Sequence, residues 1–319
     1  MALKTMPKVT AVSELMCDKC SFTIHYQKLP DRDFVSSQLE GMLKCSLGSN
    51  YFRKPYKRGI KIYEPDQNNK LRMLIQWSPI FESVAYLRVD FNPAYADSNH
   101  IFATLIGVLP GGLDDIRSHG VITRFDATVD VTGIKPHQLL AYYPKKRISE
   151  VHCKSGEIET LYLGEAGGNN RIVIYDKQLQ IKEKNQKFGL KLPELKKHTT
   201  RIEIRMKPEC TFKELLAIEN PFDKLMLRVE FEHYEKEELW RLFMVAARFL
   251  GLQDALYQLD DHTRKKFRER VEATPNAWWK PKEIWNDWSK VVHLICEPLN
   301  SKSWATEIIG AINCTKSSM

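Results

Sequence analysis

The sequence lacks any apolar run that approaches the ~20 residues of a membrane-spanning helix. Its first residues also lack the apolar segment of a signal peptide. We therefore expect an intracellular protein that makes no membrane contact. The sequence contains no glycine-rich nucleotide-binding loop of the Walker type either, which predicts that the chain does not hydrolyse ATP.

Cysteine and histidine do not occur in the common metal-binding patterns. The chain has 7 cysteines, an odd number, which argues against a disulfide scaffold in a protein of this length. Cys17 and Cys20 form a Cys-x-x-Cys pair, but a structural zinc site needs two further ligands at motif spacing, and no second pair is present. The 9 histidines include no His-x-His. A zinc or redox role for the cysteine pair therefore has little support.

The composition predicts a folded protein that binds a polyanion. Of the 319 residues, 43% are hydrophobic, which is enough for a substantial core. The formal net charge is +8. A basic excess favours nucleic acid or an anionic membrane surface. Since no membrane segment is expected, nucleic acid is the favoured partner.

Residues 171–177 predict a short strand, because they are rich in β-branched side chains. Successive side chains of a strand point to opposite faces, so Ile172 and Ile174 are expected on one face and Tyr175 and Lys177 on the other. A tyrosine beside a fixed positive charge is a candidate nucleophile. A strand tyrosine is more commonly a packing residue, so this segment alone does not decide between the two roles.

Two further segments, 124–131 and 201–205, also alternate between apolar and charged residues. Acidic residues are poor strand formers, so their presence in well-patterned strands calls for an explanation. If the three strands share a sheet, one face gathers carboxylates, arginines and the tyrosine. The residues expected on this polar face of the two segments are Arg124, Asp126, Thr128, Asp130, Arg201, Glu203 and Arg205.

These carboxylates allow two interpretations. Converging carboxylates repel each other unless a cation lies between them, and oxygen ligands suit Mg²⁺ or Mn²⁺. We therefore consider Asp126 and Glu203 candidate metal ligands, with Asp130 as a further ligand or a supporting residue. The alternative is a solvent face with cross-strand Asp–Arg and Glu–Lys pairs, each worth ~0.2–1 kcal/mol.

Four segments in this order resemble the replication initiation factor family (Rep_trans), the rolling-circle initiators of plasmids and filamentous phages. They are residues 124–130, 160–164, 171–177 and 200–205, and the resemblance covers roughly residues 15–235. Rolling-circle endonucleases commonly hold their metal with paired histidines. This chain has no such pair, so a metal would be held by carboxylates.

The resemblance implies a metal-dependent, site-specific DNA nickase. Tyr175 would attack a backbone phosphorus, which leaves a 5′-phosphotyrosine and a free 3′-OH that primes synthesis. A neutral phenol is a weak nucleophile, and Lys177 would stabilise the phenolate. Mg²⁺ or Mn²⁺ on Asp126, Glu203 and Asp130 would polarise the phosphate. The arginines suited to hold phosphate are Arg124, Arg201 and Arg205.

The resemblance also implies partners and a location, namely origin DNA in duplex and single-stranded form, a host helicase and the cytoplasm of a bacterial host. It allows a homodimer and implies no membrane. Two other functions stay open, a non-enzymatic sequence-specific DNA-binding protein and a metal nuclease that uses water as the nucleophile. Tyr162 and the pair Tyr142–Tyr143, which we expect at a helix end before Pro144, are rival nucleophiles.

Three other regions have a composition of interest. Residues 51–59 interleave aromatic residues with Arg53, Lys54, Lys57 and Arg58, which suits a nucleic-acid surface or a solvated basic arm. Residues 182–197 are rich in lysine and poorly periodic, which predicts an exposed arm. Tryptophans gather after residue 232, where we expect most of them in a core, with DNA or protein docking as the alternative. They are Trp240, Trp278, Trp279, Trp285, Trp288 and Trp304.

The predicted fold is α+β, with a central antiparallel sheet, helices packed on one of its faces and a helical region at the C-terminal end. We expect residues 1–235 to form an origin-binding and nicking domain. Residues 236–319 are expected to form the helical C-terminal region, because helical periodicity begins near residue 237.

Overall fold

The computed structural model describes residues 9–45, 48–63, 71–93, 98–144, 146, 148–152, 158–189, 191–229, 238–273 and 278–300. The chain divides into two compact units. Unit 1 comprises residues 1–15, 127–206 and 219–287, and unit 2 comprises residues 16–126, 207–218 and 288–319. The division falls within one long strand, between Asp126 and Ala127.

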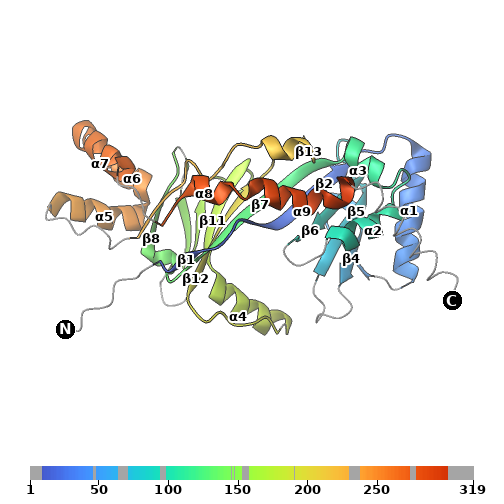
Figure 1. The fold of residues 1–319 in the computed structure, drawn as a ribbon, viewed down its shortest axis with the longest axis horizontal. Coiled ribbons are helices and arrows are strands. Elements are labelled where there is room, and N and C mark those ends of the chain that lie inside the picture. The colour runs from blue at the N-terminus through green and yellow to red at the C-terminus, as the bar shows by residue number, and fades with distance from the viewer. Residues whose placement is uncertain are drawn as a thin grey trace. The chain divides into compact units, whose positions relative to one another are not determined.

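Unit 1 contains an antiparallel sheet in the strand order β7–β12–β11–β10–β9, and the short strand β1 pairs with β7 (Figure 1). Strand β7 contributes its second half, from residue 127 onward, to this unit. The three segments predicted to share one sheet are neighbours in it, which confirms that expectation. The strands are β1 (Ala11–Val12), β7 (Val121–Thr132), β9 (Ile148–His152), β10 (Ile158–Leu163), β11 (Asn170–Asp176) and β12 (Thr199–Met206).

The register of β11 and β12 separates an apolar face from a polar one. Ile172 lies opposite Ile204, and Ile174 lies opposite Ile202. All four isoleucines are fully buried. Burying such a side chain contributes ~1.5–3 kcal/mol, and a slip of one residue would move it to the other face, so the pattern fixes the register. The predicted alternation is therefore confirmed.

The rest of unit 1 packs around a second small sheet and a group of helices. Strand β8 pairs with β14. A core with Tyr142, Trp240, Phe243 and Phe267 joins β8 to the helices. The elements are η1 (Pro136–Gln138), β8 (Leu139–Tyr142), α4 (Lys177–Phe188), β14 (Met226–Val229), α5 (Glu238–Leu250), α6 (Leu252–Tyr257), α7 (Asp261–Ala273) and α8 (Pro281–Trp285).

Unit 2 contains an antiparallel sheet in the order β3–β4–β5–β6–β2–β7, with the first half of β7 at one edge, where β13 also pairs with it. Its apolar side chains meet α1, α2 and α9. The elements are β2 (Met16–Ile24), α1 (Leu29–Lys44), β3 (Ser49–Asn50), β4 (Tyr56–Tyr63), β5 (Leu71–Pro79), β6 (Leu87–Phe91), α2 (Ser98–Ile106), α3 (Leu113–His119), β13 (Cys210–Thr211), η2 (Glu214–Ala217) and α9 (Trp288–Asn300).

The structure confirms the α+β class, the antiparallel sheet and the helical C-terminal region. The two units do not follow the predicted boundary near residue 235, because α5 to α8 belong to unit 1 and α9 belongs to unit 2. A functional division at that position stays a prediction. None of the described helices combines the length and the apolar character needed to cross a membrane.

Two local expectations are corrected. The lysine-rich segment 182–197 is not an arm throughout, because its first part completes helix α4. Tyr142 ends strand β8, so the tyrosine pair does not lie at a helix end. The packing role of the tryptophans is confirmed for Trp240, Trp279 and Trp288, which are all buried. Trp304 lies outside the described residues.

Candidate active site on the polar sheet face

The polar face of the unit 1 sheet carries several of the residues that the sequence singled out, namely Asp130, Tyr175, Arg201, Glu203 and Arg205. Tyr175 on β11 lies opposite Arg201 on β12, and Val173 lies opposite Glu203. Glu203 is therefore the diagonal neighbour of Tyr175, close enough for long side chains to meet. The strands thus hold a phenol and a carboxylate side by side.

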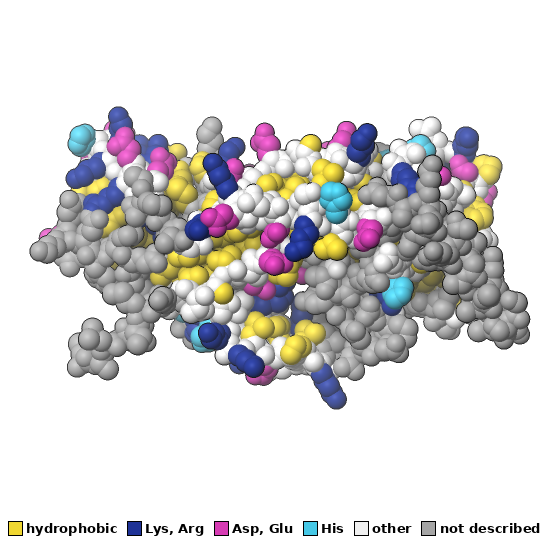
Figure 2. Space-filling view, viewed as in Figure 1, with side chains coloured by type: hydrophobic (Ala, Val, Ile, Leu, Met, Phe, Trp, Pro, Cys, Tyr) yellow, Lys and Arg dark blue, Asp and Glu magenta, His cyan; other side chains and the backbone are white. Residues whose placement is uncertain are grey.

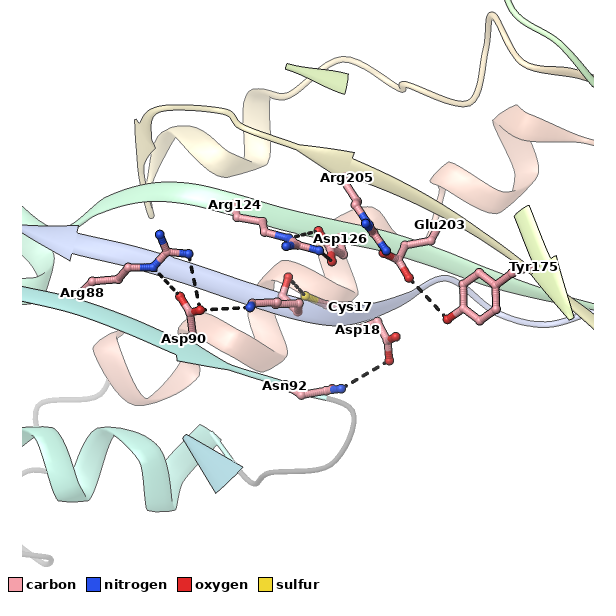
Figure 3. A network of polar contacts seen from close by, with 11 residues as sticks. Cys17, Asp18, Arg88, Asp90, Asn92, Arg124, Asp126, Tyr175, Glu203 and Arg205 are labelled. Atoms are coloured by element: carbon pink, nitrogen blue, oxygen red, sulfur yellow. Dashed lines mark hydrogen bonds and ion pairs between the residues drawn. The ribbon is translucent and has the colours of Figure 1, made fainter. Parts of the chain in front are cut away.

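The Tyr175 hydroxyl lies 3.4 Å from Oε2 of Glu203 (Figure 3). That separation is longer than the 2.5–3.0 Å typical of a strong O–H···O hydrogen bond. Both residues are buried, with 7% of Tyr175 and 4% of Glu203 exposed. The other carboxylate oxygen of Glu203 accepts a hydrogen bond of 2.5 Å from Nε of Arg205. Glu203 is thus oriented by an arginine and able to accept the phenol proton.

Lys177 does not belong to the strand, which corrects the expectation that it shares a strand face with Tyr175. Strand β11 ends at Asp176, and Lys177 is the first residue of α4. The Asp176 side chain caps the helix by accepting a hydrogen bond of 2.9 Å from the Leu179 amide. Lys177 is buried, donates to Gln180, and lies 6.0 Å from the centre of the Tyr175 ring. It therefore stays near the tyrosine, with its ammonium over the ring.

Asp130 and Arg201 form a two-point ion pair on the same face. Nε and Nη2 of Arg201 donate to the two carboxylate oxygens of Asp130 at 2.6 and 2.8 Å. Arg201 is almost fully buried. Planar two-point pairs of this kind fix both side chains. In this structure Arg201 therefore binds Asp130. This is the cross-strand Asp–Arg pair that the sequence analysis gave as the alternative to a site for metal and phosphate.

In unit 2, Arg124 holds Asp126 in the same way (Figure 3). Nε and Nη2 of Arg124 lie 2.8 and 2.6 Å from the carboxylate oxygens of Asp126. Only 2% of Asp126 is exposed. Its carboxylate is buried, and an arginine two residues earlier on the same strand balances its charge.

Each of the three predicted metal ligands is engaged by an arginine. Asp126, Asp130 and Glu203 each accept charge-assisted hydrogen bonds from an arginine. Within the described part of the chain, no group of three or more His, Cys, Asp or Glu residues is placed to hold a metal ion. The pair between Asp130 and Arg201 matches the expected cross-strand alternative, whereas Asp126 and Glu203 pair with an arginine of their own strand. A requirement for Mg²⁺ or Mn²⁺ stays a prediction.

The sequence analysis missed a further buried carboxylate, Asp90 on β6. Lys19 Nζ lies 2.9 Å from one of its oxygens and Arg88 Nε lies 2.9 Å from the other. Figure 3 shows Arg88 and Asp90 in contact. Burial alone would raise the pKa of Asp90, but the two cations outweigh it and hold the pKa below the ordinary 3.8. The signal was available, because Arg88-x-Asp90 repeats the spacing of Arg124-x-Asp126.

The rival tyrosines are placed less favourably for nucleophilic attack. Burial raises the pKa of Tyr142 and also that of Tyr143, so both phenols stay protonated to higher pH. Tyr142 is moreover part of the core around Trp240. Tyr162 on β10 is half-buried, and the Arg171 guanidinium lies 4.0 Å from the centre of its ring. It is the nearest competitor, since it lies opposite Val173 on the same sheet face.

The basic segment around β4 divides between two environments. Arg53, Lys54 and Lys57 are exposed. Arg58 forms an ion pair with Glu40 of α1. All four predicted DNA contacts are thus accessible, and the side chain of Arg58 is 51% exposed in its pair with Glu40.

Cys17 and Cys20 are buried free thiols. Burial raises the pKa of each thiol well above its ordinary value, so both are protonated. Thiolates rather than thiols bind metals and attack disulfides. These positions therefore give no support to zinc or redox chemistry.

No protein-family model matches this sequence, and comparison with curated proteins found no match. Among solved structures, the chain is similar to the rolling-circle replication initiator protein from Geobacillus stearothermophilus. The sequence identity is 13% and the TM-score is 0.36, over 76% of this chain and 98% of that one. Similarity at this level does not establish a shared family or a shared activity.

Proposed function

We propose that this chain is a rolling-circle replication initiator that nicks origin DNA, with Tyr175 as the nucleophile. The observation that supports the proposal most directly is the 3.4 Å separation between the Tyr175 hydroxyl and Oε2 of Glu203. A nucleophile next to a proton acceptor that a third group orients is the recurrent arrangement in covalent catalysis. Arg205 is the orienting group here.

The proposed reaction proceeds in one displacement. The Tyr175 hydroxyl transfers its proton to Glu203 as its oxygen attacks a backbone phosphorus. The bond between phosphorus and the 3′ oxygen breaks, and that oxygen takes a proton from solvent to become a 3′-OH. The 5′ phosphate stays joined to Tyr175 as a phosphodiester. The hydroxyl and Glu203 must approach closer when DNA binds, as catalytic hydrogen bonds commonly do.

The positive charge around Tyr175 suits a phosphate substrate. Arg171 and Arg205 lie opposite each other on β11 and β12, and Arg171 is four residues before Tyr175 on the same face. Lys177 lies beside the tyrosine ring. In the proposal these side chains attract the scissile phosphate and offset the charge that develops on it. Arg205 also orients Glu203 and keeps 33% of its side chain exposed, whereas Arg201 is buried against Asp130.

A divalent cation is not part of this proposed displacement, because the carboxylates that were expected to bind it are engaged by arginines. The helicase, the homodimer and the cytoplasm of a bacterial host stay predictions from the resemblance. Origin DNA is the proposed substrate, and the formal net charge of +8 supports a polyanion.

A second candidate is a DNA-binding protein without catalytic activity. It is favoured by the low exposure of Tyr175, 7%, and by the arginine pairing of every predicted metal ligand. In that protein the polar face would be a structural network of ion pairs. The water-using nuclease would need a metal ion, and it is less favoured because the predicted ligands pair with arginines.

Nicking of supercoiled replicon DNA, with and without Mg²⁺ or Mn²⁺, tests the proposal. We expect the wild-type chain to convert supercoiled DNA to open circles that keep protein attached after denaturation. Tyr175→Phe should form neither product, whereas Tyr162→Phe should form both. Open circles without attached protein would indicate a water-using nuclease. DNA binding without open circles would indicate the non-catalytic protein.

A further inference from the structure

Unit 2 contains a cavity of about 290 Å³ that is lined by α3, by α9 and by the chain from the end of β13 into η2. Its floor is apolar and consists of Phe212, Val292, Cys296 and Leu299, which are all buried. The Phe212 ring packs edge-on against two other core rings, with centroid distances of 5.5 and 6.4 Å. The floor is therefore held in place by the core, and a ligand does not have to order it.

The thiol in the floor does not make this cavity a reactive site. Burial raises the pKa of Cys296 to about 12. A protonated thiol is a weak nucleophile and behaves as a small apolar side chain. His293, one turn earlier on α9, also lines the cavity, but its Nδ1 donates a hydrogen bond of 2.6 Å to the Ser289 carbonyl. The cavity is therefore better suited to bind an apolar group than to react with it.

The rim of the cavity is cationic. Arg117 of α3 and Lys213, just before η2, both line the cavity and are exposed. Arg117 donates from Nε to the Leu299 carbonyl and from Nη1 to Asp114. A guanidinium has five N–H donors, so these two contacts leave donors for a ligand. Among the described residues that line the cavity, none is acidic. The rim therefore favours an anionic group.

This charge is a local property of the cavity. Another cavity, of about 230 Å³ in unit 1, is lined by Lys135 and Lys182 together with Glu159 and Asp176, so it favours neither sign. Helix α9 lies on the side of the molecule that faces the viewer in Figure 1. Figure 2 shows cations, carboxylates and apolar side chains intermixed over that side. A ligand that is both acidic and apolar is therefore selected by the cavity and not by the surface as a whole.

We propose that this cavity binds a short acidic segment of a partner protein. One aromatic or large aliphatic side chain of the segment fills the apolar floor, and carboxylates on either side of it contact Arg117 and Lys213. Leu216, which is 45% exposed, extends the apolar surface to the rim. An apolar pocket with a polar rim is the usual form of an anchor site in a protein–protein interface. The inference goes beyond the proposed function, since the displacement at Tyr175 does not involve this cavity.

Two features of the cavity favour a peptide over other anions. The two cations come from separate parts of the chain, α3 and the residues before η2, so meeting both requires more than one negative group. A peptide supplies several carboxylates around one apolar side chain, whereas a fatty acid has a single carboxylate. Nucleic acid fits less well, because the apolar floor offers no strong hydrogen-bond partner to the edge of a base.

Fluorescence anisotropy with a labelled peptide and the full-length chain tests the inference. The probe is Gly-Asp-Asp-Phe-Asp-Asp, and two control peptides replace its Phe with Ser or each of its Asp residues with Asn. We expect the probe to bind and each control peptide to bind at least about 5-fold more weakly, the loss of one strong interface contact. Absence of probe binding would overturn the inference. Equal binding of the Ser peptide would also overturn it, because the net charge of +8 would then explain the binding.

Variants of the chain separate the floor from the rim. Cys296→Leu fills the floor without a change of charge, and Lys213→Glu reverses an exposed charge that the fold does not need. Each should weaken probe binding about 5- to 30-fold. The charge-matched control is Lys44→Glu at the exposed end of α1, which should stay within about 2-fold of wild type because salt screens distant charges. An equal loss in Lys44→Glu, or wild-type binding by Lys213→Glu, would overturn the inference.

Two further results would assign the cavity to a different occupant. If decanoate displaces the probe at a lower concentration than the unlabelled peptide does, the cavity binds a small anionic lipid and the inference is overturned. If Trp304→Ser raises the affinity for the probe, residues 301–319 of the chain itself compete for the cavity, and a partner protein is not its occupant. Displacement by the unlabelled peptide, with no effect of decanoate or of Trp304→Ser, is the result that the inference predicts.

Discussion

The Glu203 carboxylate is fixed from one side by Arg205, at 2.5 Å, and meets the Tyr175 hydroxyl at 3.4 Å on the other. Such an arrangement orients the carboxylate without requiring any metal. The other two predicted ligands differ from Glu203, because Asp126 and Asp130 are each bound at both carboxylate oxygens by one arginine. Among the predicted ligands, Glu203 is therefore the one placed to take part in proton transfer.

Replacing Glu203 with Gln tests that role. The substitution keeps the shape of the side chain and removes its ability to accept the phenol proton. We expect single-turnover cleavage to fall about 100- to 10,000-fold, the usual contribution of a general base, while DNA affinity stays near the wild-type value. A matched control is Glu165→Gln, which changes an exposed carboxylate in the turn after β10. Cleavage by Glu203→Gln at the wild-type rate would rule out the proposed base.

The rival tyrosines give a second prediction. Burial raises the pKa of Tyr142 and of Tyr143, which disfavours the phenolate that would attack phosphorus. The double variant Tyr142→Phe/Tyr143→Phe should therefore cleave DNA at the wild-type rate in a single-turnover assay. Loss of cleavage in a variant that circular dichroism shows to be folded would move the nucleophile to this pair.

The ion pair between Asp130 and Arg201 should contribute to stability. Asp130→Asn leaves the buried Arg201 without its two-point partner. Removing one partner of a fully buried pair lowers the free energy of unfolding by about 3–5 kcal/mol, and we expect a smaller loss here because solvent partly screens Asp130. Asp114→Asn is the control, because the Asp114 side chain is 78% exposed in its pair with Arg117 and such pairs contribute ~0–1 kcal/mol. Urea unfolding measures both. If the two variants lost equal amounts of unfolding free energy, burial would not explain the contribution of the pair between Asp130 and Arg201.

Asp90 gives a prediction about pH. Its folded pKa is depressed by Lys19 and Arg88, so its contribution to stability is present above the ordinary pKa of 3.8 and is lost as pH falls through the lower folded value. The difference in unfolding free energy between wild type and Asp90→Asn should therefore be constant from about pH 7 to 5 and shrink below about pH 4. Urea titrations at several pH values measure it. A difference that grows as the solution is acidified would contradict the sign of the shift.

Alternation of side chains was enough to predict the central strands and their polar face. In β11 and β12 the isoleucines could only face a core, and this fixed where Tyr175, Arg201 and Glu203 point. The end of β11 was harder to predict. Asp176 begins helix α4 as its cap, but the helix that follows is rich in lysine and has too few apolar positions to show helical periodicity. The sequence therefore suggested that the strand continued through Lys177.

The partners of the carboxylates could not be predicted from the pattern. An Arg-x-Asp sequence on a strand places both side chains on one face, but it does not say whether the aspartate turns to the arginine or to a cation. The structure places Arg124 on Asp126 and Arg88 on Asp90. Arg201 instead reaches Asp130, which is 71 residues away in the chain. That choice depends on which strands become neighbours.

Peptide mapping of the covalent adduct tests the central claim most directly. The wild-type chain is incubated with supercoiled replicon DNA, digested with nuclease and protease, and analysed by tandem mass spectrometry. The account predicts a nucleotide phosphate on the peptide that contains Tyr175, with fragment ions that place it on this residue, and no adduct from Tyr175→Phe. An adduct on Tyr162 or any other residue, or nicked DNA without an adduct, would contradict it.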